Sequence, residues 1–234
     1  MPSPDDLKRK AAEASLAYVK PGMVLGLGTG STSRHVLEGI ARRVREGADL
    51  KGVPTSLATA EAARLLGIPL TSLEEHPSID VAIDGADEVD PKLDLIKGLG
   101  GALFREKIVA SAAKTFVVVV DDSKIVPRLG TKAPVPVEVH PFGWRAVAGA
   151  LETLGGRSDL RRRDGETVRT DNGNYILDAR FPSIRSAARL AADLQAIPGV
   201  VEHGLFVGMA DIVLVGQEKG VKTLRRPKGA TRRS

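Results

Sequence analysis

The segment IDGADEVD, residues 83–90, brings four carboxylates close together: Asp84, Asp87, Glu88 and Asp90. Asp84 directly follows an apolar run, so its side chain is expected to be partly removed from water. A desolvated carboxyl holds a proton more readily than one in water, which suits proton-transfer chemistry. Two other interpretations stay open for these residues: a solvated acidic turn, and a magnesium site, because hard cations bind carboxylate oxygens.

The segment GLGTGSTS, residues 26–33, has the composition of a phosphate-binding turn. Gly28 and Gly30 lead into the hydroxyl residues Ser31 and Thr32 at the expected start of a helix, where backbone N–H groups bind anions. The dinucleotide pattern is not met, because the third glycine comes one residue early and no acid ends the next strand. The nucleoside triphosphate pattern also fails, since no Gly-Lys-Ser/Thr is present. A single phosphate monoester fits the segment, and so does a tight strand-to-helix turn without a ligand.

Two further segments carry lysines, glycines and one more acid. KGLGGALFREK, residues 97–107, combines Lys97 with a run of glycines and places Glu106 one turn into a predicted helix. Glycines allow a substrate to approach the backbone closely. In VDDSK, Lys124 follows an apolar run. Taken alone, Glu106 is better described as a surface acid paired with a lysine, and Lys124 as a surface residue.

The elements that must position these residues alternate between strands and helices. Apolar runs predict strands at residues 24–28, 50–53, 79–83 and 115–120. Helical periodicity predicts helices at residues 33–46, 58–66 and 102–113. Continuous apolar strands separated by helices indicate a parallel sheet covered on both faces, in which ligands bind beyond the carboxyl ends of the strands. The clusters at Gly28, Asp84 and Lys124, together with Thr55 and Ser56, all fall at that edge.

From about residue 130 the pattern changes. Strands are predicted at residues 135–139, 156–162, 166–170, 175–181 and 200–207, with helices at residues 142–154 and 184–197. A β-α-β-β-α-β order, as in ferredoxin-like domains, can be picked out of this block. The apolar segment 210–216 is expected to return to the first sheet. We therefore expect an α/β protein with three parts: a Rossmann-like, mainly parallel sheet domain (residues 1–130 and 206–225), a smaller ferredoxin-like α/β domain (residues 131–205) and a disordered basic tail (residues 226–234).

Composition excludes several classes of protein. The 234 residues are 42% hydrophobic, enough for a core, and include no cysteine, which excludes disulfides, thiolate catalysis and zinc–thiolate sites. No apolar run is long enough to span a membrane, and the N-terminus lacks the apolar core of a secretory signal. The net charge of +5 comes from residues 219–234, which hold seven basic residues, since the rest of the chain has 27 basic and 29 acidic residues. We expect that segment to be solvated and frayed rather than to bind nucleic acid.

A set of longer motifs follows in this chain: GLGTGSTSRHV, IDGADEVD, KGLGGALFREKIVAS, VDDSKIV, PVPVEVHPFGW and IPGVVEHGLFVGMAD. In this order and spacing they resemble the type A ribose-5-phosphate isomerases, over nearly the whole chain except the basic tail. The resemblance implies an aldose–ketose isomerase without metal or cofactor, which interconverts ribose 5-phosphate and ribulose 5-phosphate through an enediolate. It also implies a cytoplasmic protein of the non-oxidative pentose phosphate pathway that forms a homodimer or homotetramer.

The resemblance also assigns roles to the candidate residues. It implies that Glu106 is the general base and that Asp84 and Asp87 serve ring opening and hydroxyl proton transfer. The substrate-binding residues that it implies are Thr29, Gly30, Ser31, Thr32, Asp84, Gly85, Ala86, Asp87, Lys97, Gly98, Leu99, Gly100 and Lys124. Leu99 interrupts a glycine run of the family, so its backbone is expected to matter and its side chain is not. Which of Lys8, Lys97 and Lys124 faces the phosphate stays open.

Three other functions compete with this one. A sugar-phosphate sensor of the repressor type would need a DNA-binding module, and none is predicted before Val24. Sugar-phosphate deaminases and lactonases usually depend on a histidine in the site, and no histidine lies in the clusters at residues 28–32, 84–90 and 97–101. A nicotinamide oxidoreductase would need the acid that is missing after the second strand.

Overall fold

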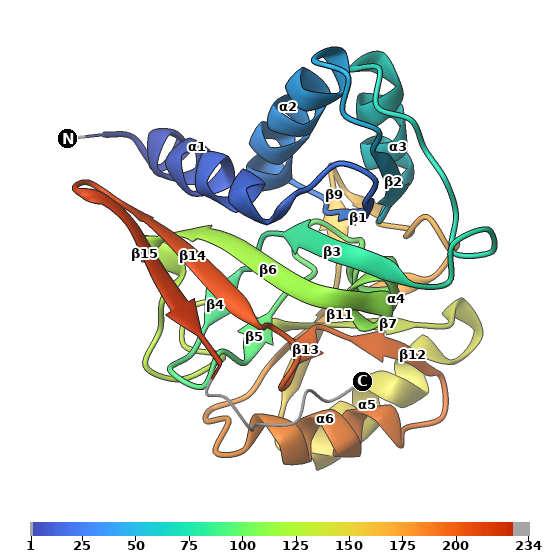
Figure 1. The fold of residues 1–234 in the computed structure, drawn as a ribbon. Helices are drawn as coiled ribbons and strands as arrows, with labels where there is room; N and C mark the ends of the chain where they lie inside the picture. The colour runs from blue at the N-terminus through green and yellow to red at the C-terminus, as the bar shows by residue number, and fades with distance from the viewer. Residues whose placement is uncertain (1, 227–234) are drawn as a thin grey trace.

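A mainly parallel sheet forms the centre of the molecule. The computed structural model describes residues 2–226, and six of their strands form this main sheet in the order β15-β14-β6-β3-β1-β2 (Figure 1). The parallel strands are β1 (Val24–Leu27), β2 (Lys51–Pro54), β3 (Ile79–Asp84), β6 (Ala113–Asp121) and β14 (Ile212–Gln217). The predicted parallel sheet, including the return of residues 210–216 to it, is confirmed.

Helices cover both faces of the main sheet, because its strands are apolar on both sides. One face carries α1 (Pro4–Ser15), η1 (Leu16–Tyr18), α2 (Ser31–Arg45) and α3 (Leu57–Leu65), and the other carries α4 (Leu103–Ala112) (Figure 1). Alternate residues of β3 supply the two cores: Val81 and Ile83 pack toward α1–α3, and Ala82 packs toward α4. The helices thereby leave the carboxyl ends of β1 and β3 at one edge of the sheet.

A smaller antiparallel sheet lies below the main sheet in Figure 1, with the order β12-β7-β11-β8. Its strands are β7 (Val135–Val139), β8 (Arg157–Leu160), β11 (Tyr175–Arg180) and β12 (Val200–His203). Its helical segments are η3 (Pro141–Gly143), α5 (Trp144–Thr153) and α6 (Ala187–Gln195). The β-α-β-β-α-β order is the predicted one. The strand expected at residues 166–170 is instead a short hairpin outside this sheet, formed by β9 (Arg162–Arg163) and β10 (Glu166–Thr167). The division into domains at residues 130 and 205 stays a prediction.

A short connecting sheet, which the sequence did not predict, joins the two larger ones and takes residues 205–206 from the single strand expected at residues 200–207. Its order is β13 (Leu205–Phe206), β5 (Leu95–Ile96) and β4 (Glu88–Val89). Immediately after β5, the N–H of Lys97 donates to the Gly204 carbonyl at 2.9 Å. Strands of two residues carry too little periodicity to be recognised in a sequence. Their consequence is that the chain leaving the smaller sheet is bonded directly to the start of the segment 97–101.

The basic C-terminal segment is partly ordered, which corrects two expectations. The view that the chain frays from Lys219 is wrong for β15 (Gly220–Arg225), which pairs with β14 along its whole length as an antiparallel edge strand. The predicted tail began at residue 226, yet the Arg226 guanidinium donates to the Ala210 carbonyl at 2.7 and 3.0 Å. An edge strand needs a hydrogen-bonded neighbour on one side only and tolerates charged side chains. The basic composition of β15 is therefore compatible with a strand, although it indicated a solvated segment in the sequence. The remainder of the predicted tail, residues 227–234, lies outside the described residues.

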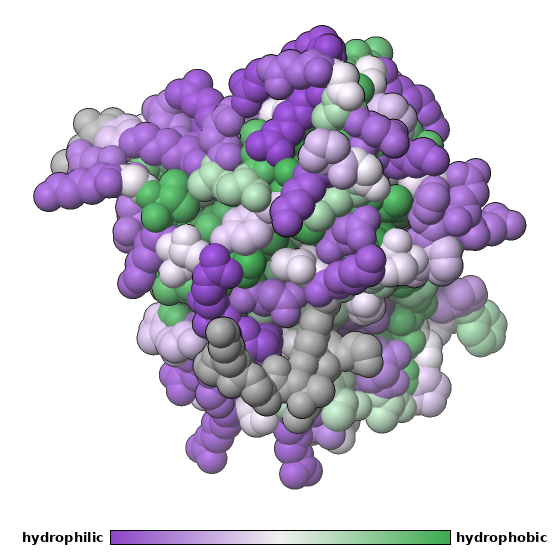
Figure 2. Space-filling view, in the orientation of Figure 1, coloured by the Kyte–Doolittle hydropathy of each residue, from purple (hydrophilic) through white to green (hydrophobic). Residues whose placement is uncertain are grey.

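The surface agrees with the balanced composition of the body. Figure 2 shows hydrophilic side chains over most of one face, with hydrophobic residues visible between them. Within the described part of the chain, no helix combines the length and apolar character needed to cross a membrane.

Candidate active site

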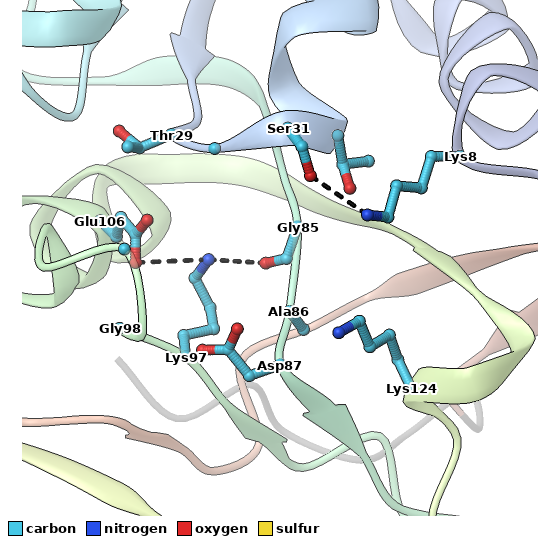
Figure 3. A pocket seen from close by; sticks show the side chains of 13 residues that line it. Lys8, Thr29, Ser31, Gly85, Ala86, Asp87, Lys97, Gly98, Glu106 and Lys124 are labelled. Carbon is cyan, nitrogen blue, oxygen red and sulfur yellow. Dashed lines mark hydrogen bonds and ion pairs between the residues drawn. The ribbon is translucent and has the colours of Figure 1, made fainter. Parts of the chain in front are cut away.

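A cavity of about 240 Å³ opens where the carboxyl ends of β1 and β3 meet the turn before α4 (Figure 3). The predicted site residues that line it are Thr29, Gly30, Ser31, Thr32, Gly85, Ala86, Asp87, Lys97, Gly98, Gly100, Glu106 and Lys124. Lys8, from α1, lines it as well. Asp84 and Leu99 are not among the lining residues, but Asp84 pairs with Lys97 and the N–H of Leu99 donates to Asp87. Segments that are far apart in the sequence therefore converge as predicted.

Lys97 is the centre of a buried charge cluster. Its ammonium lies 3.0 Å from Asp84 Oδ2 and 3.4 Å from Glu106 Oε2, and it donates to the Gly85 carbonyl at 2.6 Å (Figure 3). The Lys97 side chain is 3% exposed, and the two carboxylates are 5% exposed. Burial alone would lower the pKa of Lys97, but the charges of Asp84 and Glu106 outweigh it and raise that pKa. The lysine therefore stays a cation deep in the cavity.

Glu106 is held in a state suited to exchanging a proton. Burial raises its pKa to about 8; the charge of Lys97 opposes this, while Asp84 and Asp87 add to it. Among the described residues, Glu106 Oε2 has no hydrogen-bond partner, although it is buried. The position follows from the sequence, because α4 begins at Leu103 and its first turn aims residue 106 at the carboxyl end of β3. The arrangement provides a carboxylate whose Oε2 faces the Lys97 cation at ion-pair distance without a hydrogen bond.

Asp84 ties the glycine turn to this cluster. Its Oδ1 accepts the N–H of Thr29 at 3.1 Å, the N–H of Gly85 at 2.7 Å and the hydroxyl of Ser33 at 3.2 Å. A Cβ at Gly28 would lie 2.2 Å from the same oxygen, so this position requires glycine. With Oδ2 directed at Lys97, both oxygens of Asp84 are used for holding the site together.

Asp87 faces the cavity from the other side of Lys97. Its Oδ2 accepts the N–H of Leu99 at 3.0 Å, and burial raises the pKa of this carboxyl. The Leu99 side chain is 42% exposed, so Leu99 contributes its backbone, as expected. Gly98 and Gly101 have φ values of 105° and 89°, a region that favours glycine, and they allow the turn to fold toward Asp87.

The opposite end of the cavity is built from hydroxyls, a helix N-terminus and two lysines. α2 begins at Ser31 after Gly30, and no side chain among residues 2–226 caps its N-terminus. Lys8 Nζ lies 3.2 Å from Ser31 Oγ. Figure 3 shows Lys8 and Lys124 on the side of the cavity away from Glu106. Exposed N–H groups and two cations make this end a site for an anion.

Thr55 and Ser56, the remaining predicted cluster, contact Thr29 and do not line the cavity. The Thr29 hydroxyl lies 2.7 Å from the Thr55 hydroxyl and 2.9 Å from that of Ser56. The sequence left open whether Lys8 faces the phosphate, because the position of Lys8 depends on how α1 packs against α2. Within residues 2–226, no group of three or more His, Cys, Asp or Glu side chains is placed to hold a metal ion.

Comparison with known proteins identifies the family of this chain. The family model for ribose 5-phosphate isomerase A (phosphoriboisomerase A) matches residues 51–220. The ribose-5-phosphate isomerase A of Chloroflexus aurantiacus is 52% identical over 223 residues, which cover 94% of this chain and 93% of that protein. The solved ribose 5-phosphate isomerase A of Methanocaldococcus jannaschii has a TM-score of 0.92 and 47% identity, covering 95% of this chain and 100% of that chain. A D-ribose-5-phosphate isomerase in complex with phospho-erythronic acid has a TM-score of 0.94 and 44% identity, covering 96% of this chain and 100% of that chain. This chain belongs to the ribose-5-phosphate isomerase A family.

Proposed function

We propose that the protein interconverts D-ribose 5-phosphate and D-ribulose 5-phosphate, as an isomerase of the non-oxidative pentose phosphate pathway. The main observation in support of this function is that one cavity has two chemically different ends. One end holds a buried glutamate that pairs with Lys97 without a hydrogen bond at Oε2, and the other is an anion site with Lys8 and Lys124. A phosphate bound at the second end fixes which carbons of a short sugar meet the first.

Glu106 is the base in the proposed mechanism. Its carboxylate takes the proton from C2 of the open-chain aldose, and the electron pair moves to form an enediolate with negative charge on O1. A proton then passes from O2 to O1, the same carboxyl returns the first proton to C1, and C2=O2 becomes the carbonyl of the ketose. Correctly placed base catalysis of this kind is worth roughly 10²- to 10⁴-fold in rate.

In this mechanism Lys97 stabilises negative charge on the substrate oxygens, and Asp87 exchanges protons with the sugar hydroxyls. The Lys97 ammonium stabilises the developing oxyanion, because Asp84 and Glu106 keep it charged and in place. Asp87, whose pKa is raised by burial, exchanges protons with the sugar hydroxyls and assists ring opening. Asp84 has no free oxygen and acts by positioning Lys97. The N–H of Gly100, which lines the cavity and has no acceptor within residues 2–226, adds a donor near the same charge.

The phosphate end is assigned to Ser31, Thr32, the first N–H groups of α2, Lys8 and Lys124. Support comes from the 44% identical isomerase that binds phospho-erythronic acid. That molecule carries a phosphate at one end and a planar carboxylate at the other, and the carboxylate resembles an enediolate in shape and charge. A cavity with an anion site opposite a lysine suits such a molecule.

The direct experiment is to incubate the purified protein with ribose 5-phosphate and measure the ketose formed. A parallel sample is treated exhaustively with EDTA, and we expect the same rate in both. No ketose in either sample would favour a non-catalytic sugar-phosphate sensor. Loss of activity in EDTA that magnesium or manganese restores would show that the acidic residues bind a metal.

The remaining proposals concern the protein's surroundings. On family resemblance we propose a homodimer or homotetramer located in the cytoplasm, with no nucleic-acid partner. Light scattering coupled to size-exclusion chromatography measures the oligomeric state. A monomer at micromolar concentration would contradict the proposed homodimer or homotetramer.

A further inference from the structure

Arg161 connects the smaller sheet to the turn at the bottom of the cavity. It follows β8, and its side chain is 11% exposed. Its Nε donates to Asp178 Oδ2 at 2.8 Å, and its Nη2 pairs with Asp178 Oδ1. Its remaining Nη1 donates to the carbonyls of Gly98 at 2.8 Å and Leu99 at 3.1 Å. The Arg161 guanidinium therefore bridges two groups: the carboxylate of Asp178 and the backbone carbonyls of the turn.

The two carbonyls belong to peptide groups whose other ends point at the site. The Gly98 carbonyl shares its peptide group with the N–H of Leu99, which donates to Asp87 Oδ2 at 3.0 Å. The Leu99 carbonyl shares its peptide group with the N–H of Gly100. Gly100 lines the cavity, and its N–H has no acceptor within residues 2–226. A cation on a carbonyl polarises the peptide group and makes its N–H a stronger donor.

We propose that Arg161 is a positioning residue for the isomerisation, which orients and polarises the Gly98–Leu99 and Leu99–Gly100 peptide groups so that their N–H ends stabilise negative charge in the cavity. The inference rests on the proposed function. Charge at this end of the cavity increases when the enediolate forms, so the contribution of Arg161 is larger in the transition state than in the substrate complex. Removing it therefore lowers kcat more than it raises KM.

The neighbouring residue shows that an arginine in this stretch need not have such contacts. Arg162 is exposed and donates to the Gly165 carbonyl of its own hairpin at 3.2 Å. Lysine is not equivalent to Arg161, because a single ammonium cannot pair with both oxygens of Asp178 while it donates to two carbonyls. Arg162 therefore provides a matched control for charge and chain position.

The test compares Arg161→Met, Arg161→Lys and the control Arg162→Met. For each variant, the kcat, the KM and the affinities for two probes are measured. The probes are phospho-erythronic acid, with a planar carboxylate, and ribitol 5-phosphate, a saturated analogue without it. We expect Arg161→Met to lower kcat by about 10-fold or more, with KM within about twofold, because a weakened oxyanion donor acts on the transition state. Affinity for phospho-erythronic acid falls in parallel, and affinity for ribitol 5-phosphate does not change.

Several outcomes overturn the inference. It fails if Arg161→Met keeps the wild-type kcat, or if both probes lose affinity equally, which is the result of general damage to the cavity. If Arg161→Met does not fold, Arg161→Lys decides: wild-type kcat and wild-type affinity for phospho-erythronic acid contradict the inference, and a parallel loss supports it. Wild-type protein that makes no ketose refutes the proposed function instead, so the two failures are distinguishable.

Discussion

Two buried glutamates, Glu88 and Glu106, differ in how their charge is satisfied. Glu88 in β4 is 0% exposed, and its carboxylate accepts N–H groups of Gly130, Lys132 and Ala133 at 2.5–2.7 Å. Glu106 in α4 is 5% exposed, has Lys97 at 3.4 Å and keeps an oxygen without a hydrogen bond among the described residues. Burial is thus common to both sites. The number of donors separates a carboxylate that holds the chain together from one that can exchange a proton.

The two glutamates also differ in their effect on the stability of the folded state. Glu88 fastens the segment before β7 onto the connecting sheet, so its hydrogen bonds stabilise the folded chain. Glu106 is placed where its burial raises its pKa, which makes its ionised form unfavourable in the folded state. We expect substitutions at the two positions to affect different properties.

The largest expected effect is on catalysis at Glu106. Glu106→Gln keeps the size and burial of the side chain but removes the base, so we expect kcat to fall by at least about 10²-fold. Affinity for ribitol 5-phosphate, measured by calorimetry, should stay nearly intact. Near-normal turnover in this variant would refute the assignment of Glu106 as the base.

The second prediction concerns stability at Glu88. In Glu88→Gln the amide oxygen can still accept the N–H groups of Lys132 and Ala133, but the NH₂ cannot accept the N–H of Gly130, so one buried donor is left unsatisfied and the other bonds lose the carboxylate charge. We expect the free energy of unfolding to fall by about 3 kcal/mol, with kcat of the folded fraction within about twofold of wild type. Urea denaturation and active-site-normalised kinetics measure the two quantities. Unchanged stability would mean that the N–H groups of this segment have no net role.

The third prediction concerns the phosphate end. Lys8→Met and Lys124→Met each remove a cation from the side of the cavity away from Glu106. Each should raise KM by about 10-fold with a smaller change in kcat, because phosphate binding is shared by the substrate and the transition state. Lys10→Met, on the same helix but bonded to the Glu218 carbonyl, is the control for Lys8. A fall in kcat with KM unchanged would place the lysine at the reacting carbons.

The fourth prediction concerns the pH dependence of stability. The pKa of Glu106 is raised from 4.5 to about 8 in the folded state, so between these values the folded chain binds more protons than the unfolded chain. The contribution of Glu106 to stability is therefore present below about pH 4.5 and is lost as the pH rises toward 8. The slope for one such group is at most about 1.4 kcal/mol per pH unit.

Comparison of wild type with Glu106→Gln isolates this term, because His203, whose pKa is lowered to about 3, is common to both. Urea denaturation at several pH values should show wild type losing stability relative to the variant as the pH rises. The activity of wild type should rise over the same range, since the base must be ionised. Parallel stability curves for the two proteins would contradict a raised pKa at Glu106.

Local patterns in the sequence were sufficient for much of the fold. Apolar runs and helical periodicity predicted the parallel strands, the flanking helices and the β-α-β-β-α-β order to within a few residues. The carboxyl ends of parallel strands share an edge, so the meeting of the segments at Gly28, Asp84 and Lys124 was also predictable. The two-residue strands of the connecting sheet and the basic strand β15 were not, because their pairing depends on neighbours far along the chain.

The sequence by itself therefore determined which elements form and which edge of the main sheet carries the chemistry. The tertiary structure alone decided the roles within that edge. It paired the buried Asp84 with Lys97, left Glu106 Oε2 without a hydrogen bond, brought Lys8 to the cavity on the side away from Glu106 and brought Arg161 to the turn at Gly98. The physical reason is that secondary structure depends on residues a few positions apart, whereas burial, unpaired donors and charge pairs depend on packing between distant segments.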